Sequence, residues 1–261
     1  MIRGKNITAI IQARVDSTRL PNKVLAEIEG KPMLWHVVNR VGKSSLINQT
    51  IVAIPKDAAN DRLAEFCESH NIQYFRGSND DVLDRYCQAA KFYKSDVIVR
   101  ITADCPLIDP EVIDKVVTVF LKNDYDYVCN TLPPTYPDGL DTEVIDRNAL
   151  NVAWRNAELK SEREHVTPYI LNNPDLFRIK DVRHDIDLSN LRWTVDEPED
   201  LEYIRNVYRK LGPSSYNMAD VLKVLEDNPE FSKANQGIER NEGYAKSLRE
   251  GKQTKLHQEN D

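Results

Sequence analysis

Short apolar runs alternate with helical patterns through the first half of the chain. The apolar runs have the length of strands, and the helical patterns repeat their apolar residues with a period of about 3.6. This alternation is typical of βαβ units, so it predicts an α/β fold with a Rossmann-like, mainly parallel sheet. The predicted strands are residues 7–13, 50–54, 72–75 and 96–101, and the predicted helices are residues 32–43, 58–70, 79–93 and 110–122.

The helix predicted at 110–122 shows its pattern most clearly. Asp109 can cap its N-terminus through a side-chain oxygen, and Pro110 suits the first helical position because its φ angle is already helical. The apolar side chains recur at i, i+3, i+4, i+7 and i+8, so one face should pack on the sheet. These residues are Ile113, Val116, Val117, Phe120 and Leu121.

The pattern becomes less regular after a strand predicted to end at Cys129. A Pro-rich loop follows, and we expect residues 131–190 to form a small lobe that covers a second substrate. The chain then returns to the sheet with a strand near 191–195 and a helix at 198–210. The C-terminal end is polar and poor in large apolar residues, so it should be loosely attached. The chain thus divides into a main domain, residues 1–231, and a polar tail, residues 232–261.

Composition excludes several classes of protein. The net charge of -7 argues against a nucleic-acid-binding surface, which needs an excess of clustered Lys and Arg. No apolar run approaches the roughly 20 residues of a membrane helix, so we expect no membrane partner. The cysteines are too widely spaced for a zinc site or a disulfide framework, which predicts reduced thiols in the cytoplasm. They are Cys67, Cys87, Cys105 and Cys129.

A cluster of cations follows the first predicted strand. In an open α/β sheet, ligands bind outside the carboxyl ends of the strands, which is where Arg14, Arg19 and Lys23 should lie. Arginine offers forked donors and lysine a compact charge, so together they can neutralise a triphosphate. Taken alone, the cluster also fits a solvated basic loop.

Two acids stand at the ends of other apolar segments. Asp104 follows the strand predicted at 96–101, and Asp196 precedes the helix at 198–210. One or two carboxylates together with substrate phosphates are the ligands that Mg²⁺ prefers, so the pair predicts a shared magnesium site. Two structural interpretations stay open, because Asp104 can be a turn residue and Asp196 can cap the helix.

These clusters occur in motifs that resemble a known family. IIQARVDSTRLPNKVLAEIEGKPML, ADCPLI and VDEPEDL are similar to motifs of the cytidylyltransferases that make CMP-activated acidic sugars. That family includes the acylneuraminate and 3-deoxy-manno-octulosonate enzymes and an SpsF-type branch of spore coat polysaccharide biosynthesis. The resemblance covers about residues 5–210.

The resemblance implies a nucleotidyltransferase fold and reaction. A sugar oxygen would attack the α-phosphorus of CTP and release pyrophosphate, for a surface polysaccharide or a flagellar glycan. It implies Arg14, Arg19 and Lys23 as triphosphate ligands, and Asp104 and Asp196 as Mg²⁺ ligands. The predicted catalytic residues are Arg14, Lys23 and Asp104, and Ala13 and Thr102 are placed with the nucleotide. By analogy, we also expect a homodimer.

The end of the third predicted strand should contact the nucleobase. Gly77 and Ser78 can expose backbone groups to a base edge, while Asp84 and Arg85 can add side-chain hydrogen bonds. The segment departs from the family pattern at Val82-Leu83, which leaves the identity of the base open. A glycine turn followed by a helix cap explains much of the same sequence.

Polar residues of the predicted lobe are the candidates for contact with the sugar. Sugar hydroxyls and a carboxylate need acceptors from Asp or Glu and donors from Arg or His. Arg163 could equally belong to an exposed helix face, and His165 could be a packing residue. The candidates are Asp138, Gly139, Asp141, Glu143, Arg163 and His165.

Three other functions compete with this hypothesis. The chain could be a nucleotidyltransferase for another base or acceptor, a glycosyltransferase or a catalytically silent scaffold. A glycosyltransferase would need an Asp-x-Asp motif at a strand end, whereas the motifs at Asp124–Asp126 and Asp185–Asp187 follow no buried strand. A scaffold would have lost the metal acids. The Walker motif and G-x-G-x-x-G are both absent from the sequence.

Overall fold

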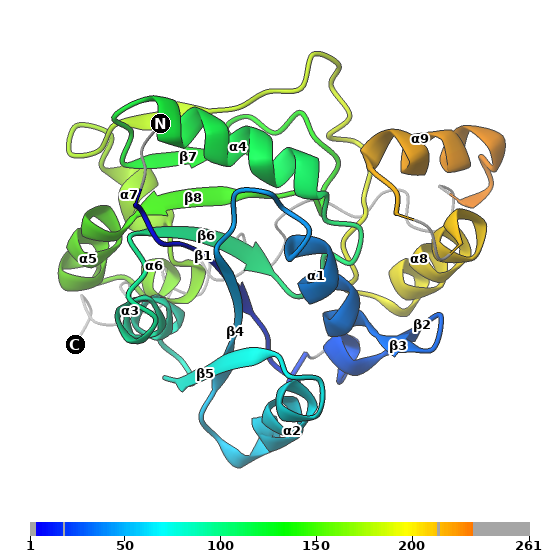
Figure 1. Ribbon diagram of the computed structural model, residues 1–261, viewed down its shortest axis with the longest axis horizontal. Helices are drawn as coiled ribbons and strands as arrows, with labels where there is room; N and C mark the ends of the chain where they lie inside the picture. The colour runs from blue at the N-terminus through cyan, green and yellow to red at the C-terminus, as the bar shows by residue number, and fades with distance from the viewer. Residues whose placement is uncertain (1–3, 18, 213–214, 232–261) are drawn as a thin grey trace, which may run out of the picture.

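The computed structural model describes residues 4–17, 19–212 and 215–231 of the chain (Figure 1). Within these ranges a seven-stranded sheet has the strand order β5-β4-β1-β6-β8-β7-β9. Its strands are β1 (Ile7–Gln12), β4 (Gln49–Pro55), β5 (Gln73–Gly77), β6 (Val97–Thr102), β7 (Tyr127–Cys129), β8 (Glu143–Asp146) and β9 (Ile179–Asp181). The predicted tail, residues 232–261, lies outside the described residues.

The parallel part of the sheet confirms the predicted α/β architecture. β1 pairs in parallel with β4 and β6, and β4 pairs in parallel with β5. β8 instead runs antiparallel between β6 and β7. Because β8 and β9 both come from residues 131–190, part of the expected covering lobe belongs to the main sheet.

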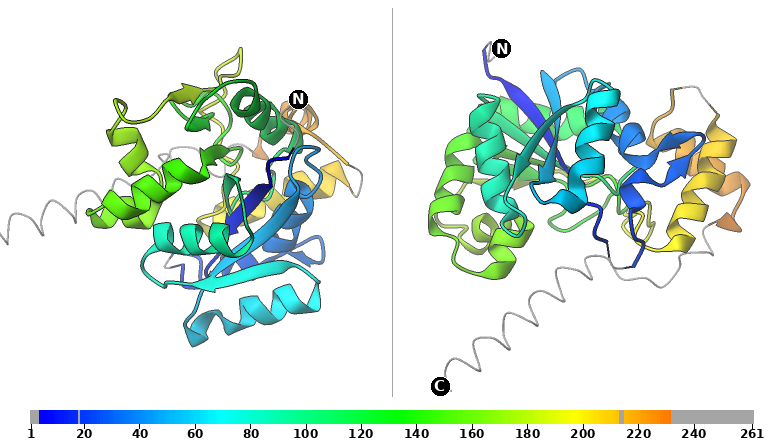
Figure 2. Two further views of the ribbon diagram at one scale, coloured as in Figure 1. Left: turned by 60° about the vertical axis from the view of Figure 1, so that its left-hand side comes forward. Right: turned by 90° about the horizontal axis from the view of Figure 1, so that it is seen from below.

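Helices cover both faces of this sheet (Figures 1 and 2). One core lies under α1, α2, α4, α8 and α9, and a second core lies under α3, α5 and α7. The helices are α1 (Met33–Val41), α2 (Asp61–Ser69), α3 (Val82–Phe92), α4 (Pro110–Lys122), α5 (Arg147–Asn156), α6 (Lys160–His165), α7 (Pro168–Asn172), α8 (Pro198–Leu211) and α9 (Met218–Asp227). Two short strands, β2 (Glu27–Ile28) and β3 (Lys31–Pro32), form a separate hairpin before α1.

Alternating side chains of β1 supply both cores. Ala9 and Ile11 belong to the first core and Ile10 to the second, and all three are fully buried. A strand that is buried on both faces reads as a continuous apolar run, which is why the sequence shows no polar alternation there. Each fully buried aliphatic side chain contributes about 1.5–3 kcal/mol to folding.

The helix predicted at 110–122 is confirmed in its bounds, its cap and its face. The Asp109 carboxylate accepts a hydrogen bond from the Glu111 N–H at 2.7 Å. The inward side chains are buried, apart from Leu121, which is partly buried against the first core. The same carboxylate also accepts from the Met218 N–H at 2.5 Å, so it ties α9 to α4.

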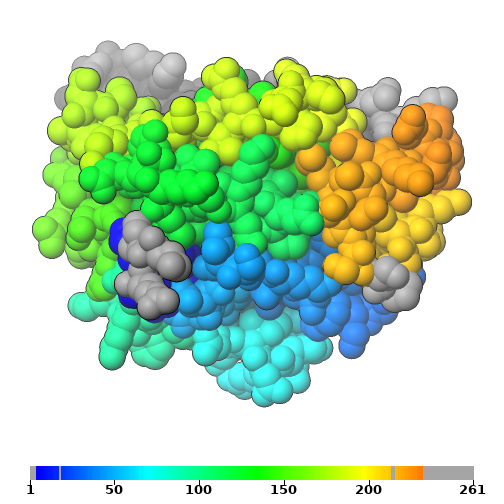
Figure 3. Space-filling model, turned by 45° about the horizontal axis from the view of Figure 1, so that its top comes forward, coloured from blue at the N-terminus to red at the C-terminus, as the bar shows by residue number. Residues whose placement is uncertain are grey.

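Segments from distant parts of the chain form one continuous surface (Figure 3). Arg40 of α1 donates to the Ile108 carbonyl at 2.6 Å and to the Tyr216 carbonyl at 3.2 Å. Its guanidinium also lies 4.0 Å from the centre of the Tyr216 ring. These contacts fasten the C-terminal helices to the α1–α4 side of the sheet.

Among the described residues, no helix combines the length and the apolarity that crossing a membrane requires.

The strand predicted near 191–195 is wrong. This segment is extended, but only an isolated bridge between Asp138 and Arg192 joins it to another segment. Trp193 donates its backbone N–H to the Asp138 carbonyl at 2.6 Å, and Val195 donates its backbone N–H to the Asp104 carbonyl at 2.9 Å. Because these bonds go to two different loops, the apolar residues are buried without forming a ladder.

Gly139 lets this extended segment approach closely. Its φ is +114°, and a Cβ there would lie 2.8 Å from the backbone carbon of Trp193. We expect Gly139→Ala to lower the free energy of unfolding by about 2–5 kcal/mol, because strain and overpacking add. Gly30→Ala is the matched control, since Gly30 also has a positive φ but no atom lies within 4 Å of the position that its Cβ would take. It should cost about 1 kcal/mol. Urea denaturation measures the free energy of unfolding of both variants. An equal loss in the two would contradict a close approach between Gly139 and Trp193.

Candidate active site

Three segments far apart in the sequence meet at the carboxyl ends of β1 and β6. These strands are parallel neighbours with Gln12 beside Thr102, so the loops that follow them leave the sheet together. The segment before α8 joins them through the hydrogen bond from Val195 to the Asp104 carbonyl. The structure thereby brings together the basic loop and both predicted metal acids.

The ammonium group of Lys23 lies between the two acids. Its Nζ is 2.9 Å from Asp104 Oδ2 and 2.7 Å from Asp196 Oδ1, and it donates to the Val195 carbonyl at 2.9 Å. The Lys23 side chain is 11% exposed. An ammonium has three N–H donors, so these three oxygens use its full donor capacity.

Electrostatics keep this cluster ionised. Burial alone would raise the pKa of Asp104, but the Lys23 charge and a hydrogen bond from Thr102 lower the pKa to about 2. Burial likewise opposes the charge on Lys23, yet Asp104 and Asp196 raise the pKa of Lys23 above its usual value. The contact between Asp104 and Lys23 therefore persists at neutral pH.

Arg192 and Asp200 hold Asp196 in position. Arg192 Nη2 lies 3.1 Å from Asp196 Oδ2 and 3.0 Å from Asp200 Oδ2. The fully buried Asp200 carboxylate also accepts from the backbone N–H groups of Asp196 and Glu197, at 2.9 and 3.0 Å. Sequence reasoning missed the roles of Arg192 and Asp200. Both residues lie in the motif around Asp196, but their spacing does not show which way the side chains point.

The two arginines of the basic loop differ in their contacts. Arg19 forms salt bridges at 3.1 Å with Asp196 and with Glu197. Arg14 is exposed and makes no hydrogen bond or salt bridge with another described residue. Its guanidinium is therefore available to an anionic ligand.

The oxygens around Lys23 fit a hard divalent cation. Two carboxylates and a backbone carbonyl are oxygen donors of the kind that Mg²⁺ binds. Over the described ranges, no three His, Cys, Asp or Glu side chains are grouped to hold a metal ion. Asp104 and Asp196 would therefore need oxygens from a bound triphosphate to complete a coordination shell.

Arg85 is a buried cation beside the predicted base loop. It is 3% exposed, and its Nε and Nη1 have no hydrogen-bond partner in the described structure. Its stem packs on Gly77, where a Cβ would lie 2.9 Å from Arg85 Cγ. Burial lowers the pKa of Arg85, and the charges of Arg14 and Asp16 also act on it. Its guanidinium thus lies toward the loop after β1 with donors to spare.

The other residues predicted near the base take part in the local fold. Ser78 Oγ accepts from the Asp81 N–H at 3.2 Å. The Asp84 carboxylate accepts from the Trp154 indole N–H at 2.9 Å. These bonds form the N-terminal turn of α3 and attach it to α5, which favours a structural role for the Asp84 side chain.

Ala13 and Thr102 lie at the ends of the two central strands. The Ala13 N–H donates to the Ala53 carbonyl at 3.1 Å, so it is not free to bind a nucleotide. The Thr102 hydroxyl is 3.2 Å from Cys105 Sγ and also bonds to Asp104. Thr102 therefore supports the ionised state of Asp104.

Two of the predicted sugar contacts lie beside the carboxylate cluster. Asp138 is buried, 3.6 Å from Arg192. Burial raises the pKa of the Cys105 thiol, and the charges of Asp104, Asp141 and Asp138 raise it further, which places Asp141 near this cluster. His165 comes from the other side of the site. Burial lowers the pKa of His165, and the charges of Arg100 and Arg14 lower it further. His165 therefore shares its surroundings with the basic loop.

Glu143 is directed inward and fully engaged. Its carboxylate forms a short salt bridge with Arg100 and accepts from Tyr127 at 2.5 Å and from Thr167 at 2.8 Å. This network favours a structural role for Glu143. Arg100, to which sequence reasoning gave no role, keeps a buried Nε without a partner among the described residues. The sequence feature that could have pointed to Arg100 is a single cation within an otherwise apolar strand.

Arg163 is likewise occupied by contacts within the protein. Its Nε donates to Asp81 Oδ2 at 2.8 Å, and its Nη1 donates to the Trp154 carbonyl at 2.5 Å. The structure therefore does not offer a free Arg163 guanidinium to a sugar. The side chain instead fastens α6 to the start of α3.

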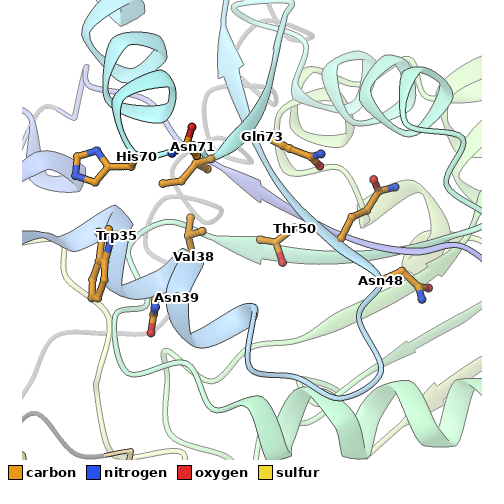
Figure 4. Close-up of a pocket in the computed structure, with 10 residues that line it drawn as sticks. Trp35, Val38, Asn39, Asn48, Thr50, His70, Asn71 and Gln73 are labelled. Atoms are coloured by element: carbon orange, nitrogen blue, oxygen red, sulfur yellow. The ribbon is translucent and has the colours of Figure 1, made fainter.

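A separate groove of about 500 Å³ lies at the opposite end of the strands (Figure 4). Trp35 and Asn39 of α1 face His70 and Asn71 across the start of β4. It contains none of the predicted site residues. Charged side chains converge at the carboxyl ends instead, where ion pairing shifts the pKa values of Lys23 and Asp104, so we assign the candidate site there.

Comparison with known proteins points to one family. The profile of the family Cytidylyltransferase matches residues 8–242. The chain is 33% identical to the spore coat polysaccharide biosynthesis protein SpsF of Bacillus subtilis, over 86% of this chain and 96% of that protein. It is 38% identical to the 3-deoxy-manno-octulosonate cytidylyltransferase of Geobacter metallireducens over 42% of this chain and 43% of that enzyme. A solved cytidylyltransferase from Leptospira borgpetersenii superimposes with a TM-score of 0.86 at 30% identity, over 91% of this chain and all of that one.

The lowered pKa of Asp104 predicts a pH-dependent contribution to stability. Its folded-state pKa of about 2 lies below the usual 3.8, so the stabilisation is present above pH 4 and is lost as pH falls toward 2. It amounts to about 2 kcal/mol. The difference in unfolding free energy between wild type and Asp104→Asn should therefore narrow over that range, as measured by urea denaturation. The exposed Asp185→Asn is the control, and a difference between wild type and Asp104→Asn that stays constant with pH would contradict the assignment.

Proposed function

This chain belongs to the cytidylyltransferase family, and we propose that it transfers CMP from CTP to an acidic or modified sugar of a surface polysaccharide or flagellar glycan. The observation that carries the proposal is the convergence of Lys23, Asp104 and Asp196 beside the basic loop. Transfer at phosphorus depends on positioning and charge neutralisation more than on a protein nucleophile. A site made of cations and metal-binding acids suits that chemistry.

The proposed reaction forms one bond and breaks another at the α-phosphorus. A sugar hydroxyl oxygen bonds to the α-phosphorus, its proton passes to solvent or a nearby base, and the bond from that phosphorus to the bridging oxygen breaks. Pyrophosphate leaves with that oxygen and its electrons. Arg14, Arg19 and Lys23 neutralise the triphosphate and the departing pyrophosphate. When bound by Asp104 and Asp196, Mg²⁺ would add Lewis-acid stabilisation of charge on the phosphates.

The buried cation Arg85 supports the choice of nucleotide. The buried Arg85 has spare donors for the carbonyl and ring nitrogen of a pyrimidine, which suits CTP. We place the sugar carboxylate near His165, because the positive charges of Arg100 and Arg14 act on that side chain. Asp138, Gly139 and Asp141 complete the acceptor side of the proposal.

We also propose a cytoplasmic homodimer. CTP is made and used inside cells, and the four cysteines are free, buried thiols, which suits a reducing compartment. The dimer rests on analogy with the family, and the segment 131–190 is its proposed covering and pairing region.

Pyrophosphate release tests the proposed reaction. Purified protein with CTP, Mg²⁺ and a panel of nonulosonic and octulosonic acids should release pyrophosphate with at least one acceptor. Asp104→Asn should lower kcat at least about 100-fold while the fold is kept, because one metal ligand is lost. Asp185→Asn, in an exposed Asp-x-Asp sequence, should retain full activity. No release with CTP, UTP, GTP or ATP across the panel would contradict the proposal, and loss of activity in Asp185→Asn would favour a glycosyltransferase.

Arg85 should bind nucleotide at the expense of stability. Replacing Arg85 with Met keeps the stem that packs on Gly77 and removes a buried charge. We expect Arg85→Met to weaken CTP binding at least about tenfold in calorimetry, a loss of about 1.4 kcal/mol or more. The free energy of unfolding should stay equal or rise, because an unpaired buried guanidinium is costly. The exposed Arg155→Met should change neither quantity, and a destabilised Arg85→Met that still binds CTP normally would contradict this role.

A further inference from the structure

Lys23 occupies the oxygens that a metal ion would need. Asp104 Oδ2, Asp196 Oδ1 and the Val195 carbonyl all lie within 2.9 Å of its Nζ. The other oxygen of Asp196 is also engaged, since Arg19 and Arg192 both contact Oδ2 at 3.1 Å. Three cations thus share one carboxylate, and each oxygen of Asp196 already contacts a positive charge.

The same geometry keeps Lys23 from the triphosphate. Its three N–H donors are directed to three protein oxygens, so it has none for a phosphate. Lys23 can neutralise a phosphate only by leaving at least one carboxylate. A divalent cation can bridge the two carboxylates only when the ammonium has left, because Lys23 Nζ occupies the space between Asp104 Oδ2 and Asp196 Oδ1.

The movement of Lys23 to a phosphate and the binding of a divalent cation by the carboxylates favour each other. A triphosphate attracts Lys23 and Arg19 away from the acids, and the acids are then unpaired and accept a divalent cation. We infer that the Lys23 ammonium holds the metal position until nucleotide binds, so that nucleotide binding opens the metal site. This inference rests on the proposed function, since it takes the triphosphate and the metal to be its ligands. By linkage, the metal must strengthen nucleotide binding by the same factor.

Metal binding without nucleotide tests the inference directly. Mn²⁺ serves as the probe, and electron paramagnetic resonance measures its free concentration in solutions of the full-length protein. Wild type should bind Mn²⁺ weakly, whereas Lys23→Gln should bind it at least about tenfold more tightly, because glutamine keeps a hydrogen-bond donor but carries no charge. Equal affinities in the two proteins would overturn the inference.

Arg19→Gln is the matched control for net charge. It removes one positive charge beside Asp196 and leaves the ammonium between the carboxylates. Its Mn²⁺ affinity should rise much less than that of Lys23→Gln. An equal rise in both variants would show that only net charge matters and would overturn the exchange.

A measurement on wild type covers the case in which Lys23→Gln does not fold. Nitrogen-15 NMR of lysine side chains should show a Lys23 ammonium whose protons are protected from exchange with water. Adding CTP without metal should change the chemical shift of this signal or remove its protection. A Lys23 signal that CTP leaves unchanged would overturn the inference. Pyrophosphate release distinguishes failure of this inference from failure of the proposed function. If the enzyme turns over but Lys23→Gln does not change the metal affinity, only the exchange between Lys23 and the metal is contradicted. If Lys23→Gln raises the metal affinity but no nucleoside triphosphate is turned over, only the proposed reaction is contradicted.

Discussion

One ammonium group between two carboxylates organises the candidate active site. Lys23 comes from the loop after β1, Asp104 follows β6 and Asp196 precedes α8, so these contacts join three parts of the chain. Without the ammonium, two ionised acids would lie side by side in partly buried surroundings, which is unfavourable. The position of the extended segment before α8 therefore depends on charge as well as on the burial of Trp193.

Arg85 departs from the rule that buried charges are paired. Its Nε and Nη1 have no partner among the described residues, whereas Arg100 is paired with Glu143 and Arg192 is paired with Asp200. Such a contrast is expected where a protein keeps donors for a ligand and accepts a loss of stability. The location of these unpaired donors, near the charge of Arg14, is what distinguishes a substrate site here from an ordinary network of surface ion pairs.

Sequence patterns predicted the regular elements well because periodicity reports burial. The helix at 110–122 and the parallel strands β1, β4, β5 and β6 follow from apolar spacing and caps. The strand prediction for residues 191–195 is wrong because a buried segment outside a sheet can have the same apolar composition as a strand. Glu143 and Arg163 were assigned to the sugar from their residue types, and neither composition nor spacing reveals that Arg100 and Asp81 already bind them.

The sequence by itself determined the α/β class, the cations after the first strand and the acids at two later segment ends, because each is a local pattern. Only the tertiary structure decided which charges meet. Lys23 and Asp196 are far apart in the sequence, and their contact depends on the register of β1 with β6 and on the hydrogen bond between Val195 and Asp104. Contacts across such separations depend on how the whole chain packs, and a local pattern contains no record of them.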